Sequence, residues 1–325
     1  MEHRKILVTG GLGLIGHNVV QRLENQGHTV IVVDNRTNYN MIPRSELDYL
    51  MQERMHKIHT RNLSCIDIED SYAIDWIMKL HEPDSIIHLA SFPRQKVVNK
   101  NPQRGSRTMS EGLLNLLENA CKHKVKKFVY ISSSMVYGDF DDQVCEDYEC
   151  HPQGQYGIMK LAGELLVKDY HRRGFFDYSI IRPSAVYGPL DVEDRVISKF
   201  LLTAMRGGTL RVNGGQETLD FTYVDDAADG IVAAALLDSG NNRTFNITKS
   251  HSKTLLEAAH LAISIVGKGE IEVHNRDLDF PSRGALNIDA ARKHLEFDPK
   301  VDIEEGFQRY YDWLTNSSYW QQLLK

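Results

Sequence analysis

Hydrophobic positions in this chain cluster into short runs that are separated by longer segments of mixed polarity. The runs are rich in β-branched residues and cover residues 5–10 (KILVTG), 28–34 (HTVIVVD), 85–90 (SIIHLA), 127–133 (KFVYISS) and 178–184 (YSIIRPS). Continuous apolar runs of this length are typical of strands that are covered on both faces. The pattern therefore predicts a parallel sheet.

The segments between these runs have helical patterns, and we expect helices over residues 15–26, 71–80, 110–123 and 156–173. Strands that alternate with helices predict an α/β fold with a doubly wound, Rossmann-type parallel sheet.

The regular alternation weakens after Arg182. Residues 195–208, 254–267 and 303–314 have helical patterns, whereas residues 209–215 and 219–224 are typical of short strands. We expect a Rossmann-type domain over residues 1–182 and a smaller, mixed α/β cap mainly over residues 183–325. Later segments are expected to return to the first domain.

Composition excludes several classes of partner. The 325 residues carry a net charge of −6, so no general basic field favours nucleic acid. The amino terminus has no long apolar run, and we expect no membrane anchor. Four cysteines, at 65, 121, 145 and 150, form no CxxC pair, which favours a reducing, cytoplasmic location. His56 and His59 lack an obvious third ligand, and we expect no metal site.

A glycine-rich turn joins the first run to the first helix. Gly10, Gly13 and Gly16 allow a tight turn and a close approach of the backbone to a pyrophosphate, which the first amides of the helix hold. Asp34 ends the next strand at the spacing of a ribose-binding acid, which favours NAD over NADP, although nearby Arg36 weakens this preference. The competing interpretation is a plain strand–turn–helix without a ligand.

Asp67 lies in the polar turn after a third apolar stretch. Its carboxylate is placed to accept a hydrogen bond from an adenine amino group, but a simple loop acid is an equally good interpretation.

Tyr156 and Lys160 lie four residues apart at the start of a predicted helix, so they share one face. A nearby ammonium lowers the pKa of a phenol, which suits tyrosine to proton transfer. This spacing is often accidental, but here a dinucleotide fingerprint and a serine-ended strand precede it.

These residues together resemble the extended short-chain dehydrogenases/reductases that act on nucleotide sugars. The shared motifs are VTGGLGLIG, HLA at 88–90, ISSSMVYG, YGIMK, IIRPSAVYGP, DFTYVDDAADGI and NIDAARKHLEFDP. The resemblance implies a bound NAD or NADP, of which Asp34 favours NAD, a nucleoside-diphosphate sugar as substrate, and a homodimer.

The resemblance also implies roles for individual residues. Tyr156 is expected to take a proton from a sugar hydroxyl, usually at C4, while Lys160 lowers its pKa and holds the nicotinamide ribose. Ser133, four residues before Tyr137, is expected to hydrogen-bond the reacting sugar oxygen. Alternatively, Ser132, Ser133 and Ser134 only end the strand by bonding its backbone.

The full set of contacts implied in this way has two parts. Expected NAD contacts are Gly10, Gly13, Leu14, Ile15, Gly16, Asp34, Asn35, Asp67, Ile68, Leu89, Ala90, Ser91, Ser132, Tyr156, Lys160 and Pro183. Expected substrate contacts are Ser133, Ser134, Ala185, Lys199, Arg211 and Arg283.

Residues after Ser133 bear on the reaction. Sugar 4,6-dehydratases of this family carry an Asp-Glu pair there, whereas this chain has Ser134 and Met135. We therefore expect an NAD-dependent epimerase that oxidises a sugar hydroxyl, at C4, and reduces the ketone back. A net C4 dehydrogenase or reductase is the alternative, and a protein that only binds nucleotide is a third hypothesis.

Three positions depart from the epimerase pattern. Leu219 replaces an arginine that clamps the substrate diphosphate, and residues 182–185 (RPSA) replace an RYFN motif; Met109 stands where asparagine is common. Arg211 and Arg283 are candidate replacements for the missing cation. Arg94, Lys96 and Arg107 are weaker candidates, because a solvated surface charge explains each of them better.

Overall fold

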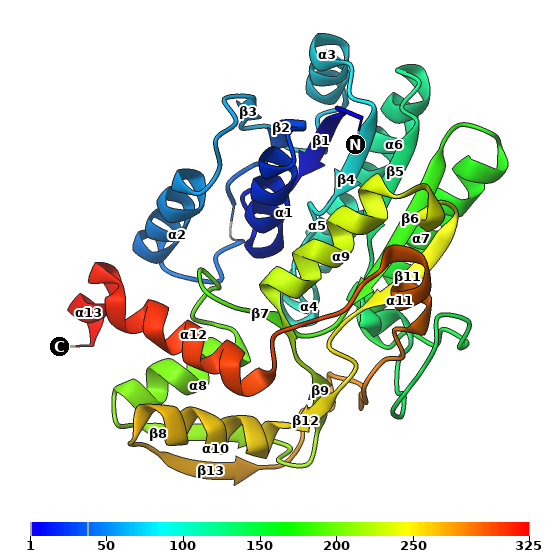
Figure 1. Ribbon diagram of the computed structural model, residues 1–325. Coiled ribbons are helices and arrows are strands. Elements are labelled where there is room, and N and C mark those ends of the chain that lie inside the picture. The colour runs from blue at the N-terminus through cyan, green and yellow to red at the C-terminus, as the bar shows by residue number, and fades with distance from the viewer. Residues whose placement is uncertain (1, 38, 325) are drawn as a thin grey trace.

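The centre of the molecule is a seven-stranded parallel sheet, seen in a computed structural model that describes residues 2–37 and 39–324 (Figure 1). Its strand order is β11-β6-β5-β4-β1-β2-β3. The strands are β1 (Lys5–Thr9), β2 (Thr29–Val33), β3 (Leu63–Ser64), β4 (Ser85–His88), β5 (Lys127–Ile131), β6 (Asp177–Pro183) and β11 (Arg243–Ile247). All neighbouring pairs are parallel, as the apolar runs predicted.

Helices cover both faces of this sheet. On one face, α1 (Leu14–Asn25) packs beside α9 (Val224–Leu236), with α11 (Asp289–Leu295) near β11. On the other face lie α3 (Ser71–His81), α6 (Gly112–Lys122) and α7 (Gly154–Arg172). Short helices α4 (Gln95–Lys100) and α5 (Pro102–Ser106) and a π-helical turn (Arg107–Glu111) lead into α6. The α/β, doubly wound prediction is confirmed.

Strand order reverses between β1 and β4, because the chain builds outward from β1 to β3 and then returns to the other side. In doubly wound sheets, ligands bind at the carboxyl ends of the strands at this switch point. The segments that follow β1, β4 and β5 therefore meet at one edge, and these segments contain most of the predicted site residues.

A smaller, mixed unit lies below this edge in Figure 1. It contains α8 (Val196–Met205), α10 (Leu255–Val266), α12 (Ile303–Asn316) and α13 (Ser318–Leu323). Its strands form three pairs: β7 (Val186–Tyr187) with β10 (Thr222–Tyr223), β8 (Thr209–Asn213) with β13 (Glu270–His274), and β9 (Thr218–Asp220) with β12 (Ser252–Thr254). Helix α9 and strand β11 return to the large sheet, although they follow residue 182 in the chain. The division into two domains at residue 182 stays a prediction.

Helix α2 (Arg44–His56) was not predicted from the sequence. Its apolar residues Leu47 and Leu50 are buried, and the ring of Tyr49 stacks on Tyr319 of α13 with centroids 4.6 Å apart. The helix is weakly amphipathic, so contacts with the carboxyl-terminal part of the chain stabilise it. Local sequence gives little sign of such contacts.

Candidate active site

The glycine-rich turn packs against the chain that follows β4. Gly10 has φ +71°, and a Cβ atom at this position would lie 2.6 Å from the backbone nitrogen of Ala90. Gly13 precedes α1 in an extended conformation, without a side-chain cap on the helix. The first amides of α1, including those of Leu14 and Ile15, therefore point toward the edge where an anion is best stabilised.

Asp34 follows β2 and lies beside this turn. Its carboxylate accepts hydrogen bonds from the amides of Leu12, at 3.0 Å, and Arg36, at 2.8 Å. Burial raises the pKa of Asp34, although these hydrogen bonds act in the opposite direction. The acid thus braces the turn and keeps further lone pairs for a ribose hydroxyl.

A cavity of about 390 Å³ opens next to this acid. Asp67 lines it and accepts a hydrogen bond from Asn35 Nδ2 at 3.1 Å. Ile68, by contrast, is buried in the core beneath α6. The other lining residues are Thr37, Tyr39, Asn40, Phe92, Asn101 and Arg104.

Tyr39 and Arg104 are lining residues that the sequence did not single out. The ring of Tyr39 packs on Phe92, with centroids 4.0 Å apart, and Arg104 lies 3.4 Å from Asp67. Both come from irregular segments or short helices without a motif. They become apparent only in the folded chain, where the segments after β2, β3 and β4 line the same cavity.

Ser133, Tyr156 and Lys160 converge at the carboxyl end of β5. Ser133 has an extended backbone, and its Oγ accepts a hydrogen bond from the amide of Met135 at 3.2 Å. Lys160 Nζ donates to the carbonyl of Ile131 at 2.7 Å and lies 5.9 Å from the ring centre of Tyr156. The structure therefore brings the three predicted catalytic residues together.

The protonation of this group differs from the sequence-based expectation. Burial raises the pKa of Tyr156, although the charge of Arg195 and a hydrogen bond with Ser133 pull it down. Burial lowers the pKa of Lys160 to about 7, and Glu164 acts against this shift. The expected net lowering of the tyrosine pKa is thus wrong for the protein itself, because burial outweighs the nearby charges.

Arg195 is a further residue near Tyr156 that the sequence did not indicate. It directly precedes α8, without a side-chain hydrogen bond to the helix, and lies 3.9 Å from Asp191, a buried acid whose pKa burial raises. The loop over residues 188–195 carries this guanidinium to the catalytic edge. Its irregular sequence, DVEDR, gives no spacing from which the placement follows.

The neighbouring serines have separate environments. Ser132 Oγ donates to Glu164 Oε1 at 2.5 Å, and Ser134 is 1% exposed in a short 3₁₀ turn. Ala185, another expected contact, lies two residues after Pro183, and its backbone has φ +38°. Leu89, Ala90 and Ser91 form the turn after β4, against which Gly10 packs.

The cations predicted to bind substrate differ in their surroundings. Lys199 forms an ion pair with Asp194, which also binds Arg94 at 2.7 Å. Arg211 is exposed, and its Nε donates to Asn213 on the same strand at 3.2 Å. Arg283 differs from both. Its Nε is buried and finds no hydrogen-bond partner among the described residues.

Burial lowers the pKa of Arg283 to about 10, against the charge of Glu217. A guanidinium in this state is incompletely compensated, which suits it to an anionic ligand. The weaker candidates are otherwise engaged, since Lys96 pairs with Asp277 at 2.8 Å and Arg107 pairs with Glu69 and Glu111. Met109 is buried in an apolar cluster that Tyr156 also contacts.

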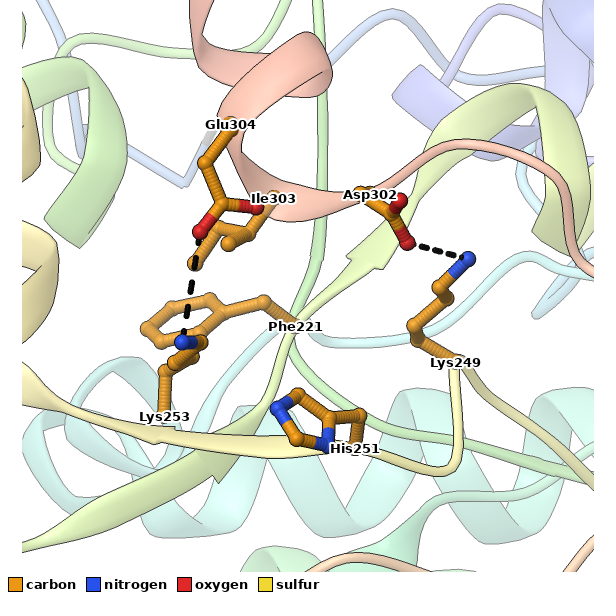
Figure 2. Close-up of a pocket in the computed structure, with 7 residues that line it drawn as sticks. All are labelled: Phe221, Lys249, His251, Lys253, Asp302, Ile303 and Glu304. Atoms are coloured by element: carbon orange, nitrogen blue, oxygen red, sulfur yellow. Dashed lines mark ion pairs between the residues drawn. The ribbon is translucent and has the colours of Figure 1, made fainter.

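A second hollow of about 180 Å³ lies in the cap, away from these residues, between the amino terminus of α12 and β12 (Figure 2). Lys249 points at Asp302, 2.8 Å away, and Lys253 lies 3.9 Å from Glu304. Its cations are thus paired with acids of the same hollow, and it contains none of the predicted site residues.

Residues 2–37 and 39–324 lack two further features. No helix there is long and apolar enough to cross a membrane. No group of three or more His, Cys, Asp or Glu side chains there is arranged to hold a metal ion.

Residues 6–248 match the model of the NAD dependent epimerase/dehydratase family. UDP-glucuronic acid decarboxylase 1 of Arabidopsis thaliana is 31% identical over 94% of this chain and 68% of its own length. UDP-glucuronate 4-epimerase of Thermodesulfobacterium geofontis is 29% identical over 94% of this chain and 95% of its own. The structure of UDP-glucuronic acid 4-epimerase from Bacillus cereus, in complex with UDP-glucuronic acid and NAD, superposes with a TM-score of 0.88 at 28% identity, covering 98% of this chain and 99% of that chain.

Proposed function

This chain belongs to the NAD dependent epimerase/dehydratase family, and we propose that it epimerises a UDP-sugar at C4. It is an NAD-dependent enzyme of nucleotide-sugar metabolism. The observation that carries the proposal is the convergence of Ser133, Tyr156 and Lys160 beside the glycine-rich turn, without an acid pair at positions 134 and 135.

The residues at the sheet edge fit NAD. The close approach of Gly10 to Ala90 leaves no room for a side chain, so the turn before α1 is tight. We propose that the pyrophosphate binds at this turn and accepts hydrogen bonds from the amides of Leu14, Ile15 and Gly16. We propose that Asp34 and Asn35 contact the adenosine ribose and that Asp67 contacts the adenine. When bound, the cofactor would supply the redox chemistry: its oxidised form accepts a hydride and its reduced form donates it back.

In the proposed reaction, Tyr156 accepts the proton of the C4 hydroxyl and later returns it, while Ser133 hydrogen-bonds the same oxygen. Lys160 has three ammonium protons and donates one to the carbonyl of Ile131, so two remain for a ribose hydroxyl or the phenol oxygen. Arg195 adds positive charge that favours the phenolate of Tyr156.

Dehydration fits this site less well. Elimination of water from the sugar needs an acid and a base next to the catalytic serine. Ser134 is buried, and Met135 has no ionisable group. Epimerisation needs neither, because the oxidised sugar has only to turn over and accept the hydride on its other face.

The diphosphate of the substrate is proposed to bind Arg283. Leu219, which stands where a clamping arginine is common, is partly buried against the apolar core of the cap. Arg283 lies beside the strand that carries Leu219, since Thr218 Oγ1 donates to the Arg283 carbonyl at 2.5 Å. Its buried, unpartnered Nε is the feature that supports this role.

A uronic acid or a neutral hexose is proposed as the sugar, and uridine as the nucleoside, because the relatives are named for UDP-glucuronate chemistry. A net C4 dehydrogenase that releases NADH is the second candidate, since the same catalytic residues serve it. The two differ only in whether the oxidised sugar and reduced cofactor stay bound until the hydride returns.

One assay separates these proposals. Purified protein is incubated with UDP-glucuronate, UDP-glucose and UDP-galactose while NADH absorbance is followed, and sugar products are resolved by chromatography. We expect a C4 epimer without accumulation of NADH, and we expect Y156F to lose the activity. Stoichiometric NADH would favour the dehydrogenase, and release of carbon dioxide a decarboxylase. No product from any of these substrates would overturn both enzyme proposals.

Two further features belong to this proposal. The exposed faces of α6 and α7 carry Leu114, Ile158 and Leu165, which are 37%, 51% and 60% exposed. We propose that a second copy of the chain covers this apolar surface, as the resemblance implies for a homodimer. All four cysteines are free thiols, which supports the proposed cytoplasmic location.

A further inference from the structure

A buried acid on α7 connects the catalytic residues to the sheet. Glu164 is 0% exposed and lies one helical turn after Lys160. Its Oε1 accepts from Ser132 Oγ at 2.5 Å and from Arg182 Nε at 2.9 Å. Its Oε2 accepts from Arg182 Nη2 at 2.7 Å. A buried carboxylate with this bidentate partner is held in one position.

Arg182 is in turn held from three sides. Beyond the two bonds to Glu164, its Nη1 donates to the carbonyl of Glu146 at 3.0 Å. Its guanidinium carbon lies 4.7 Å from the ring centre of Tyr137, whose hydroxyl donates to Asn246 at 2.8 Å. Burial lowers the pKa of Arg182, but the bonds and charge of Glu164 more than offset this, so the arginine is charged.

Glu164 contacts the strand end that carries the catalytic serine. Ser132 precedes Ser133 directly, and its amide donates to Ile181 at 2.7 Å. Because the Ser132 hydroxyl donates its hydrogen bond to Glu164, it can only accept a hydrogen bond from a ligand. Lys160 donates to Ile131, one residue earlier on the same strand. The two side chains thus join α7 to consecutive residues at the end of β5.

Lys160 has few other charged neighbours. Tyr130 of β5 lies with its ring centre 5.3 Å from Nζ, and burial keeps its pKa well above the usual value. His88 of β4 interacts with Lys160, but burial lowers its pKa to about 3, so it is neutral. Tyr156 on α7 also has a raised pKa. Among these groups, Glu164 supplies the negative charge that favours protonated Lys160.

We propose that Glu164 is a positioning residue of the active site, which holds the end of β5 through Ser132 and Arg182 and keeps the Lys160 ammonium charged. This inference deepens the proposed function and rests on it for the reaction, but not for the state of Lys160. A merely structural ion pair would stabilise the fold without any effect on the titration of Lys160.

The test is the titration of Lys160 by NMR of protein labelled with [13Cε]lysine, with K160R to assign its signal. We expect a midpoint near neutral pH in the unaltered chain and a shift to lower pH by about one unit or more in E164Q. That shift is a tenfold or greater loss of protonated Lys160 above neutral pH. E164D keeps the charge, and we expect it to recover most of the midpoint. D169N on the same helix removes an exposed acid that pairs with Arg172, and we expect no shift.

Because E164Q leaves Arg182 buried and unpaired, the double variant E164Q/R182Q is measured in parallel. It removes both charges, and we expect a downward shift of the Lys160 midpoint that is smaller than in E164Q, because loss of the Arg182 charge acts in the opposite direction. An unchanged midpoint in E164Q or in the folded double variant would overturn the inference.

Activity is read separately from the titration. If the chain epimerises a UDP-sugar, kcat of E164Q should fall more steeply with rising pH than that of the unaltered chain, with little change in KM. If no sugar is turned over by the unaltered chain, the proposed function fails, yet the titration of Lys160 still decides the role of Glu164.

Discussion

Gly10 packs directly on the backbone of Ala90, which leaves no space for a side chain between the first turn and the chain after β4. A Cβ atom on Gly10 would come within 2.6 Å of the Ala90 nitrogen, and the residue also has φ +71°. The two features have separable consequences, because Gly174 has a similar φ of +83° and no atom within 4 Å of its Cβ position.

We expect G10A to abolish NAD binding and to destabilise the protein by more than the left-handed backbone alone requires. In G174A, only the backbone strain is present, which costs about 1–2 kcal/mol. Isothermal titration with NAD and urea unfolding measure the two effects. Equal unfolding free energies for the two variants, with NAD affinity retained in G10A, would contradict the assigned role of the turn.

Arg283 is expected to control the affinity for the substrate diphosphate. R283M removes a charge-assisted contact, and we expect the dissociation constant for UDP to rise by about 10- to 100-fold. NAD affinity should not change. R211M is the matched control, because Arg211 also lies in the cap but is exposed and bonded to its own strand. A larger loss in R211M than in R283M would reverse the assignment.

Glu46 on α2 is expected to make stability depend on pH. It is 1% exposed and accepts the amide of Glu193 at 2.7 Å, and burial raises its pKa to about 7 from a usual value near 4.5. The folded protein therefore holds a proton that the unfolded chain releases between these pH values. Its contribution to stability falls as pH rises through this window.

The isosteric variant E46Q removes this dependence and retains an oxygen for the Glu193 amide. We expect E46Q to gain about 3 kcal/mol in unfolding free energy well above pH 7, relative to the unaltered chain, and to match it below pH 4.5. Denaturant unfolding at several pH values measures this. E53Q, on the same helix but 40% exposed, should leave the profile unchanged. A loss of stability in E46Q at high pH would show that the charged form is favoured.

The apolar surface on α6 and α7 predicts a dimer that one charge disrupts. Ile158 is 51% exposed, and I158E should shift the chain from dimer to monomer in light scattering coupled to size-exclusion chromatography. Val273 is 55% exposed on β13 of the cap, so V273E serves as the control and should remain dimeric. A monomer in the unaltered chain at micromolar concentration would remove the basis of this proposal.

Much of the catalytic edge followed from local sequence. Glycines at a strand–helix junction, an acid after the next strand, and a tyrosine and lysine one helical turn apart are patterns within short segments. The local backbone structure of each segment explains its pattern, so the positions of Gly10, Asp34, Tyr156 and Lys160 were predictable. The parallel sheet that brings them to one edge was predictable as well. Helix α2 was not, because its stability depends on the stacking of Tyr49 with Tyr319, which is remote in sequence.

The sequence by itself determined which chemical groups meet at the sheet edge, because the carboxyl ends of neighbouring parallel strands must lie together. Only the tertiary structure decided their electrostatic states. Burial raises the pKa of Tyr156, contrary to the expectation from its spacing with Lys160, and lowers the pKa of Lys160, for which the spacing gave no expectation. Arg195 and Glu164 act on these two groups from a cap loop and from a buried ion pair with Arg182. Desolvation and long-range contacts set such states, and neither can be calculated from neighbours along the chain.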